Sequence, residues 1–356
     1  MQWKNEITKL LGVTYPIVQA PMLGVSTPQM AAAISNAGGL GSLAVGGLSP
    51  QRTTDLIRAT RALTDKPFAV NFFAHDIPVP DKEQVAPMKM LLLGLCSKYG
   101  LPFEEGDFEP FHFSSYKEQV EILVKEGVQA VSFTFGIPDD DSIGIMKRAG
   151  ISLTGTATSC AEAMALEEKG VDIITAQGIE AGGHRGSFIE GALPQVGLMS
   201  LLTTIRAHTR TPVLATGGIC DGRSVHGAMA MGAAGVQIGT LFIASTESAA
   251  IPSYKAAVCR ASDTDSKLTR AFSGRWARGL RNAFMEEVEA ANIPIPPYPI
   301  QNSLTGKIRT IAQQLDNKEM TNLWTGQCTA KVTERPSAVI FKDLVREIEE
   351  LKKENT

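Results

Sequence analysis

The sequence lacks the marks of a secreted, membrane or nucleic-acid-binding protein. Its five cysteines are scattered without C-x-x-C spacing, so we expect reduced and mostly structural thiols: Cys96, Cys160, Cys220, Cys259 and Cys328. The formal charge is only −3, and no clustered basic face indicates a nucleic-acid partner. No apolar run approaches the roughly 18 residues of a membrane span, and the first residues do not resemble a signal peptide. We therefore expect a cytoplasmic protein without membrane attachment.

Two common ligand motifs are also missing. The turn after the first apolar run reads APMLGVSTP, which is not the G-x-G-x-x-G fingerprint of a dinucleotide-binding sheet. No histidines, cysteines and carboxylates stand at metal-ligand spacing, so no metal is expected. A doubly wound open sheet is therefore the second choice for the fold.

What the sequence does contain is an alternation of short apolar runs and helices. Each helix runs through a glycine into the next run, and the junction recurs about every 20 residues over part of the chain. One helix has readable ends, with Thr27 and Pro28 at its start and Gly38 at its end. The apolar runs are nearly continuous, as is typical of parallel strands covered by helices: Pro16–Pro21, Leu40–Val45, Pro67–Phe73, Ala130–Gly136, Ser152–Ala157, Asp172–Gly178, Pro212–Gly218 and Gly235–Thr240. About eight such units close into a (β/α)8 TIM barrel.

The chain is longer than a minimal barrel. We assign residues 1–244 to the barrel and residues 245–310 to a smaller inserted subdomain that lies over the active-site face as a lid. This subdomain is expected to contain a helix over Ser273–Asn292. Residues 311–356 form a C-terminal segment that returns to the barrel and ends in a peripheral helix. A second long excursion, His75–Tyr116, delays the fourth strand.

Glycines follow the last two predicted strands. Barrel enzymes place their chemistry at the carboxyl ends of the strands, and the loops after strands seven and eight commonly hold a phosphate. Gly217 and Gly218 stand at the first of these places, and Gly239 and Thr240 at the second. Backbone N–H groups without side chains in the way can bind a phosphate there, although glycines also serve simply to make tight turns.

Two amides point to a heterocyclic ligand at the same end of the barrel. Asn71 and Gln177 each follow a strand and carry a donor and an acceptor, which suits the N–H and C=O edge of a flavin. Buried amides that cap loops are the alternative. Pro21 and Met22, after the first strand, can pack against such a ring.

The stretch QGIEAGGHRGSF contains the candidate catalytic histidine. His184 follows Gly182 and Gly183 a few residues beyond the sixth strand, where flexible backbone can approach a ligand closely. A histidine bonded to a loop carbonyl is the alternative. The other four histidines are weaker candidates because they lie in the long excursion or within helices: His75, His112, His208 and His226.

Several stretches together resemble one family. QAPMLGVSTPQMAAAISNAGGLGSL, AQGIEAGGHRGSF, LATGGI, GVQIGTLF, YPIQNSLTGKIR and LWTGQ are similar to segments of the nitronate monooxygenases, formerly called 2-nitropropane dioxygenases. The similarity runs through nearly the whole chain. It implies a (β/α)8 barrel that binds FMN and oxidises alkyl nitronates, including propionate 3-nitronate, with dioxygen to a carbonyl compound and nitrite.

The resemblance also assigns roles to residues. It implies His184 as the active-site histidine, with Tyr298 and Lys307 lining the substrate pocket. It implies cofactor contacts by Asn71, Gln177, Gly217, Gly218, Gly239, Thr240, Gly326 and Gln327. The sequence departs from the family pattern at Thr134, where a second pocket histidine is expected, and at Ser303, where another tyrosine is expected. Both changes concern the substrate pocket rather than the flavin site.

Two other functions fit the same signals. Enoyl-acyl carrier protein reductases and quinone reductases use a flavin on a similar barrel but take hydride from NAD(P)H. A non-catalytic phosphate-ligand sensor would need no flavin at all. The expected small-molecule partners are a nitronate and dioxygen, and a homodimer is left open.

Overall fold

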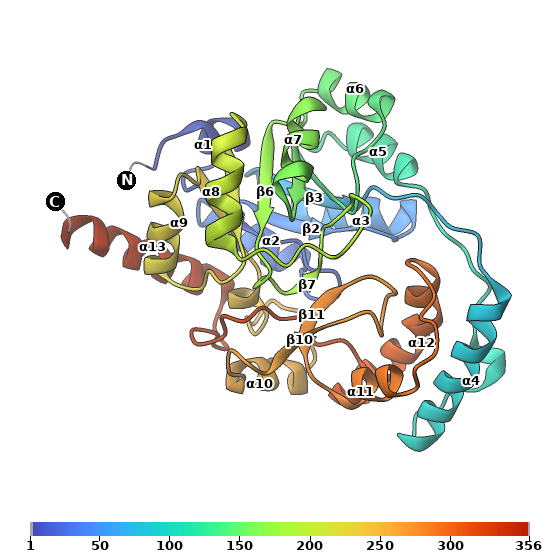
Figure 1. Cartoon of the computed structure of the whole chain (residues 1–356). Coiled ribbons are helices and arrows are strands. Elements are labelled where there is room, and N and C mark those ends of the chain that lie inside the picture. Colours follow the sequence, from blue (N-terminus) through green and yellow to red (C-terminus); the bar gives the residue numbers. More distant parts are fainter. Residues whose placement is uncertain (1–2, 355–356) are drawn as a thin grey trace.

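The computed structural model describes residues 3–354 and is built around a closed parallel barrel (Figure 1). Its strands are hydrogen-bonded in the order β1-β9-β8-β6-β5-β4-β3-β2, and a bridge between Val18 and Leu40 joins the two ends of this order. Every predicted apolar run supplies one strand: β1 (Ile17–Gln19), β2 (Gly41–Ala44), β3 (Phe68–Phe73), β4 (Ala130–Thr134), β5 (Ser152–Ala157), β6 (Ile173–Gln177), β8 (Val213–Thr216) and β9 (Gly235–Ile238). The (β/α)8 fold is confirmed.

Helices alternate with these strands and cover the outside of the barrel. They are α2 (Pro28–Asn36), α3 (Pro50–Arg61), α5 (Tyr116–Lys125), α6 (Asp140–Arg148), α7 (Cys160–Glu168), α8 (Leu198–His208), α9 (Gly222–Ala230) and α13 (Ser337–Glu354). The predicted cap of α2 is confirmed, because the side chain of Thr27 accepts a hydrogen bond from Met30 N at 3.1 Å. Gly38 has φ +96°, the left-handed conformation that ends this helix.

The amino end of the barrel is closed by α1 (Glu6–Leu11). Ile7 and Leu11 are buried against Val18, Leu40 and Leu214 at the starts of the strands. Burial of such a side chain stabilises the fold by about 1.5–3 kcal/mol. The opposite, carboxyl end is therefore the end left for a site.

A second, antiparallel sheet lies at that carboxyl end. Its strands are ordered β10 (Ser266–Thr269), β11 (Ala277–Leu280) and β7 (Gly183–His184), so the loop after β6 contributes one strand. The helix predicted over Ser273–Asn292 is wrong in its first part, because residues 277–280 pair with the preceding strand β10, and residues 277–278 also pair with β7, which is distant in the sequence. The helix α11 (Ala283–Ala290) begins only after Asn282, whose side chain accepts from Met285 N.

The subdomain combines two segments that are far apart in the sequence. The helix α4 (Lys82–Lys98), from the His75–Tyr116 excursion, packs against α11 and α12 (Ile300–Gln314). Met88 and Leu92 share one buried cluster with Phe284 and Leu304. The helix α10 (Pro252–Arg260) precedes β10 on the same side of the molecule (Figure 1). The division of the chain at residues 244 and 310 stays a prediction.

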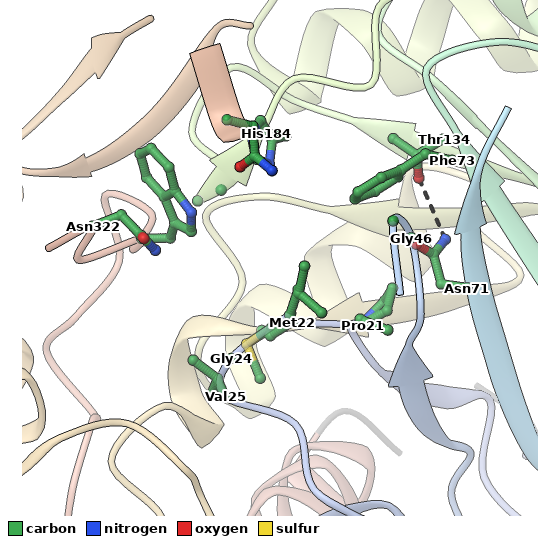
Figure 2. A pocket seen from close by; sticks show the side chains of 18 of the residues that line it. Pro21, Met22, Gly24, Val25, Gly46, Asn71, Phe73, Thr134, His184 and Asn322 are labelled. Carbon is green, nitrogen blue, oxygen red and sulfur yellow. Dashed lines mark hydrogen bonds between the residues drawn. The ribbon is translucent and has the colours of Figure 1, made fainter. Parts of the chain in front are cut away.

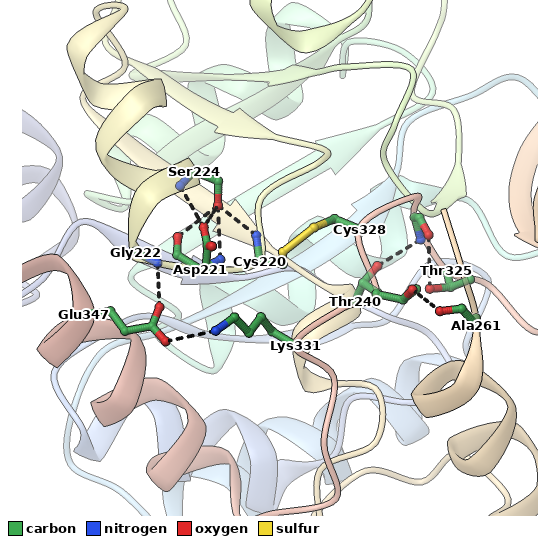
Figure 3. Close-up of a disulfide and its surroundings, with 12 residues drawn as sticks. Cys220, Asp221, Gly222, Ser224, Thr240, Ala261, Thr325, Cys328, Lys331 and Glu347 are labelled. Carbon is green, nitrogen blue, oxygen red and sulfur yellow. Dashed lines mark hydrogen bonds and ion pairs between the residues drawn. A yellow bond between two sulfur atoms is a disulfide. The ribbon is translucent and has the colours of Figure 1, made fainter. Parts of the chain in front are cut away.

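The helix α13 in the C-terminal segment packs against helices of the barrel. The buried face of α13, which includes Ile340, Phe341 and Leu344, packs against α9 and α2. A disulfide between Cys220 and Cys328 corrects the expectation that all cysteines are reduced (Figure 3). The two cysteines are 108 positions apart and meet only because the segment before α13 passes the loop after β8. Within residues 3–354, no helix has the length and apolar character needed to cross a lipid bilayer.

Candidate active site

A cavity of about 740 Å3 lies at the carboxyl ends of the barrel strands, beneath the subdomain (Figure 2). The loops after β1, β3, β6, β8 and β9 form its barrel side, and α12 with residues 321–328 forms part of the other side. This volume is in the range of small-molecule and cofactor sites. Both excursions from the minimal barrel therefore contribute to the cavity.

The predicted phosphate loops line this cavity. Gly217 and Gly218 have φ +109° and +68°, a region that favours glycine, and a Cβ on Gly217 would come within 3.0 Å of Ala181 N. Gly239 and Thr240 lie beside them in the loop after β9. The two glycine turns therefore lie side by side on the cavity wall.

The C-terminal segment is hydrogen-bonded to the loops after β6 and β9. Gly326 N donates to Thr240 Oγ1 at 2.9 Å, and Gln327 N donates to Glu180 O at 3.0 Å. The contact is close, since a Cβ on Gly182 would lie 2.4 Å from Gly326 N. Figure 3 shows Thr240 and Thr325 near the disulfide. Gly326 lines the cavity, whereas Gln327 does not.

The two predicted amide side chains line the cavity, but part of their hydrogen-bonding capacity is already used within the protein. Asn71 Nδ2 donates to Ser132 Oγ at 2.9 Å. Gln177 Nε2 donates to the carbonyl oxygen of His184 at 2.9 Å, and its Oε1 accepts from Gly186 N at 2.8 Å. Gln177 therefore fixes the histidine loop as well as lining the cavity.

Pro21 and Met22 also line the cavity. In Figure 2 both lie across the open space from His184. The backbone N–H of Met22 donates to Ser26 Oγ at 3.0 Å. This N–H group is therefore already used, and Met22 can contact a ligand in the cavity through its side chain. Gly182 and Gly183 complete the predicted set around the histidine.

His184 lies in β7 and is surrounded by aromatic rings. The ring centroids of Phe135 and Trp324 are each 5.4 Å away, and that of Tyr298 is 6.2 Å away. Its Nε2 lies 2.8 Å from Ser273 Oγ. Burial lowers the pKa of His184 to about 3, with smaller contributions from the positive charges of Arg275 and Arg309. The imidazole is therefore neutral near pH 7.

Tyr298 stands next to His184 on the cavity wall. It meets the edges of His75 and Phe135 with centroid distances of 4.8 and 5.3 Å. Burial raises the pKa of its phenol, so it stays protonated.

Lys307 reaches the cavity from α12, but it already forms an ion pair with Asp107. Its Nζ lies 2.8 Å from Asp107 Oδ1, and both side chains are partly exposed. The hydrogen bond between them raises the pKa of Lys307 and lowers the pKa of Asp107. This ion pair joins the His75–Tyr116 excursion to α12 at the cavity.

The sequence reasoning missed other cavity residues. His75 belongs to the excursion and is a weak candidate from the sequence, yet it lines the cavity, and burial lowers its pKa. Its place two residues after β3 was the signal that could have identified it. Phe135 has φ +78°, a strained backbone for a residue other than glycine, and stacks on Phe73 at 4.3 Å. Trp324 and Arg309 also line the cavity, and they stand in LWTGQ and YPIQNSLTGKIR, two of the stretches that carry the family resemblance.

Among residues 3–354 no cluster of three or more histidine, cysteine or carboxylate side chains is arranged to hold a metal ion. Around the cavity lie amide, hydroxyl and aromatic groups, glycine backbone, single cations and the carboxylates of Asp107, Glu109 and Glu180. This mixture suits an organic ligand with polar groups.

The sequence model of the family described as nitronate monooxygenase matches residues 4–350. This chain belongs to the nitronate monooxygenase family. Relatives from Staphylococcus aureus strains JH9 and N315, each named "Probable nitronate monooxygenase", are 40% identical over 350 residues, which are 98% of this chain and 98% of each relative. The family resemblance in the sequence is confirmed.

Solved structures agree with membership of the nitronate monooxygenase family. A nitroalkane oxidase from Streptomyces ansochromogenes is 36% identical, with a TM-score of 0.89 over 99% of this chain and 100% of that one. FabK from Thermotoga maritima is 29% identical, with a TM-score of 0.78 over 99% and 98% of the two chains. Together the relatives support an oxidoreductase that acts on nitro compounds.

Proposed function

We propose that this protein binds FMN and oxidises alkyl nitronates with dioxygen to a carbonyl compound and nitrite. The residues present fit this cofactor. The glycine turns after β8 and β9 expose backbone to a phosphate at neighbouring positions, and the cavity extends from them to His184. The bound FMN would supply the acceptor for the electron that leaves the nitronate.

Individual residues would hold FMN as follows. The backbone at Gly217, Gly218, Gly239 and Thr240 would bind the phosphate. Asn71 and Gln177 would lie near the polar edge of the flavin ring, with Pro21 and Met22 packed against its apolar surface. Gly326 would close the site through its bond to Thr240.

His184 is the observation that carries the proposal for the substrate. An imidazole whose pKa is about 3 is a poor base for removing a proton from carbon. It is suited to a substrate that arrives as an anion, and a nitronate is already the deprotonated form of a nitroalkane. Tyr298 adds a protonated phenol on the same wall.

Ser273 would set the direction of the hydrogen bond. Its hydroxyl lies within reach of the carbonyl oxygen of Arg275, at 3.2 Å, and of His184 Nε2, at 2.8 Å. When the hydroxyl donates to Nε2, the imidazole proton is on Nδ1 and is available to a nitronate oxygen. An anion in the cavity favours that tautomer because it needs a donor.

The test is oxygen consumption by purified protein with a nitronate and with the neutral nitroalkane from which it derives. We expect a yellow protein that releases FMN on denaturation and consumes oxygen far faster with the nitronate. No oxygen uptake with any nitronate would refute the proposal. Rapid anaerobic bleaching of the flavin by NADH, with none by a nitronate, would favour the reductase alternative. The cytoplasmic location and a homodimer remain predictions from the sequence.

A further inference from the structure

His75 is a second histidine on the cavity wall, and no part of the proposed reaction uses it. It lies two residues after β3 and is half-buried. Its ring meets that of Tyr298 at a centroid distance of 4.8 Å and that of Phe135 at 6.3 Å. His184 contacts the same two rings, at 6.2 and 5.4 Å. The two histidines therefore border the same part of the cavity, and one small ligand can contact both.

The backbone fixes which nitrogen of His75 carries the proton. Nδ1 lies 2.8 Å from the carbonyl oxygen of Asp76, and a carbonyl oxygen can only accept a hydrogen bond. In the neutral imidazole the proton is therefore on Nδ1, which leaves a lone pair on Nε2. Within residues 3–354 no group is hydrogen-bonded to Nε2, and this nitrogen is not fully enclosed by protein. His75 therefore offers a ligand a hydrogen-bond acceptor.

The charges around His75 indicate which kind of donor it can accept from. Burial lowers the pKa of His75, the hydrogen bond to Asp76 partly opposes this shift, and the positive charge of Arg275 adds to it. The imidazole is therefore neutral near pH 7. Arg275 repels a further cation, so an ammonium group is disfavoured beside the ring. A hydroxyl group donates a hydrogen bond without bringing a charge.

We propose that His75 is a specificity-determining residue whose Nε2 accepts a hydrogen bond from the substrate, so that the site favours nitronates with a hydroxyl group on the carbon next to the reacting one. This inference rests on the proposed oxidation of nitronates, with the nitronate group itself at His184. An alkyl group in place of the hydroxyl would displace water from Nε2 without replacing its hydrogen bond, which is unfavourable. The acceptor at His75 thus discriminates against purely alkyl substrates.

The first experiment compares two nitronates of nearly the same shape. The nitronate of 2-nitroethanol has a hydroxyl group where that of 1-nitropropane has a methyl group. We expect the ratio of their kcat/KM values, hydroxyl over methyl, to fall roughly tenfold in His75→Phe, because the ring stays and the acceptor is lost. His75→Gln should keep part of the ratio, since its amide oxygen can accept a hydrogen bond.

His112→Phe is the matched control. His112 also lines the cavity, but within residues 3–354 it makes no ring contact with Tyr298 or His184. The ratio in this variant should stay within about twofold of the parent's. An equal loss with both nitronates in His75→Phe would leave the ratio unchanged and would overturn the inference, because His75 would then only support the cavity wall. An equal fall of the ratio in His112→Phe would also overturn it.

The second experiment does not depend on turnover. The anions 3-hydroxypropionate and butyrate resemble the two nitronates, because a carboxylate has the planar shape and the charge of the nitronate group. Calorimetry on the flavin-loaded protein should show the parent preferring 3-hydroxypropionate, and His75→Phe should reduce this preference roughly tenfold. The anion 3-fluoropropionate is polar but cannot donate a hydrogen bond, so it should bind like butyrate. If the parent oxidises neither nitronate, the proposed function fails, and the binding of the acids still decides the inference. No preference for 3-hydroxypropionate in the parent, or equally tight binding of 3-fluoropropionate, would overturn it.

Discussion

Gly182 is the position where the structure predicts a large loss of stability from the addition of a single methyl group. A Cβ at this position would lie 2.4 Å from Gly326 N and 2.4 Å from the carbonyl carbon of Thr325. Both are backbone atoms, so no side-chain rotation can relieve the overlap. In Gly182→Ala the C-terminal segment must therefore move away from the loops that contain Glu180 and Thr240.

The cost can be worked out from the contacts that this movement breaks. Overpacking in a tight site costs about 1–3 kcal/mol. Loss of the bonds from Gly326 N to Thr240 and from Gln327 N to Glu180 adds about 1 kcal/mol each. Gly182→Ala should therefore lose about 3–5 kcal/mol of unfolding free energy.

Gly183→Ala is the matched control in the adjacent residue. Its φ is +72°, but a Cβ there would meet nothing within 4 Å, so only the left-handed conformation costs about 1–2 kcal/mol. We expect Gly182→Ala to melt about 3–4 °C below Gly183→Ala. It should also lose more flavin on ultrafiltration. Equal melting temperatures and equal flavin retention would refute the reasoning.

Three further predictions concern the cavity and the disulfide. His184→Asn should slow anaerobic flavin reduction by a nitronate ~100- to 1,000-fold at equal flavin loading. A change of only about twofold would mean that His184 supports the structure of its loop and makes no catalytic contact. Gly218→Val should yield largely flavin-free protein by absorbance, because φ +68° is strained for valine and the added side chain, which begins 3.6 Å from Glu180 Cβ, would force the turn to change shape; full occupancy would contradict this. Reduction of the bond between Cys220 and Cys328 should lower the unfolding free energy by about 2–4 kcal/mol, while Cys328→Ser should unfold identically with and without reductant.

The barrel could be predicted because its signals are local. Each strand is a short apolar run. Thr27 and Pro28 mark the start of α2, and Gly38 marks its end. The strand β11 could not be predicted in this way. Its residues 277–280 read as helix until their partners in β10 and β7 are known.

The same distinction applies to the site. The position of Gly217, Gly239 and His184 at the cavity could be predicted, because each follows a strand whose carboxyl end faces it. Ser273 and Arg309 come from the subdomain, where the way two chain segments pack decides which side chains face inward. No spacing rule marks such residues in advance.

The strand β7 gives the histidine two attachments. It belongs to a loop of the barrel, yet it is hydrogen-bonded to β11 of the subdomain. The part of the subdomain that follows β9 is connected to the barrel at its start by β9 and at its end by α13, so it is held at both ends. A hinged swing of the subdomain would therefore pull on His184. If the cavity opens by such a swing, the histidine moves with the subdomain, and a substitution that loosens the pairing of the outer strand β10 would alter substrate entry and chemistry together.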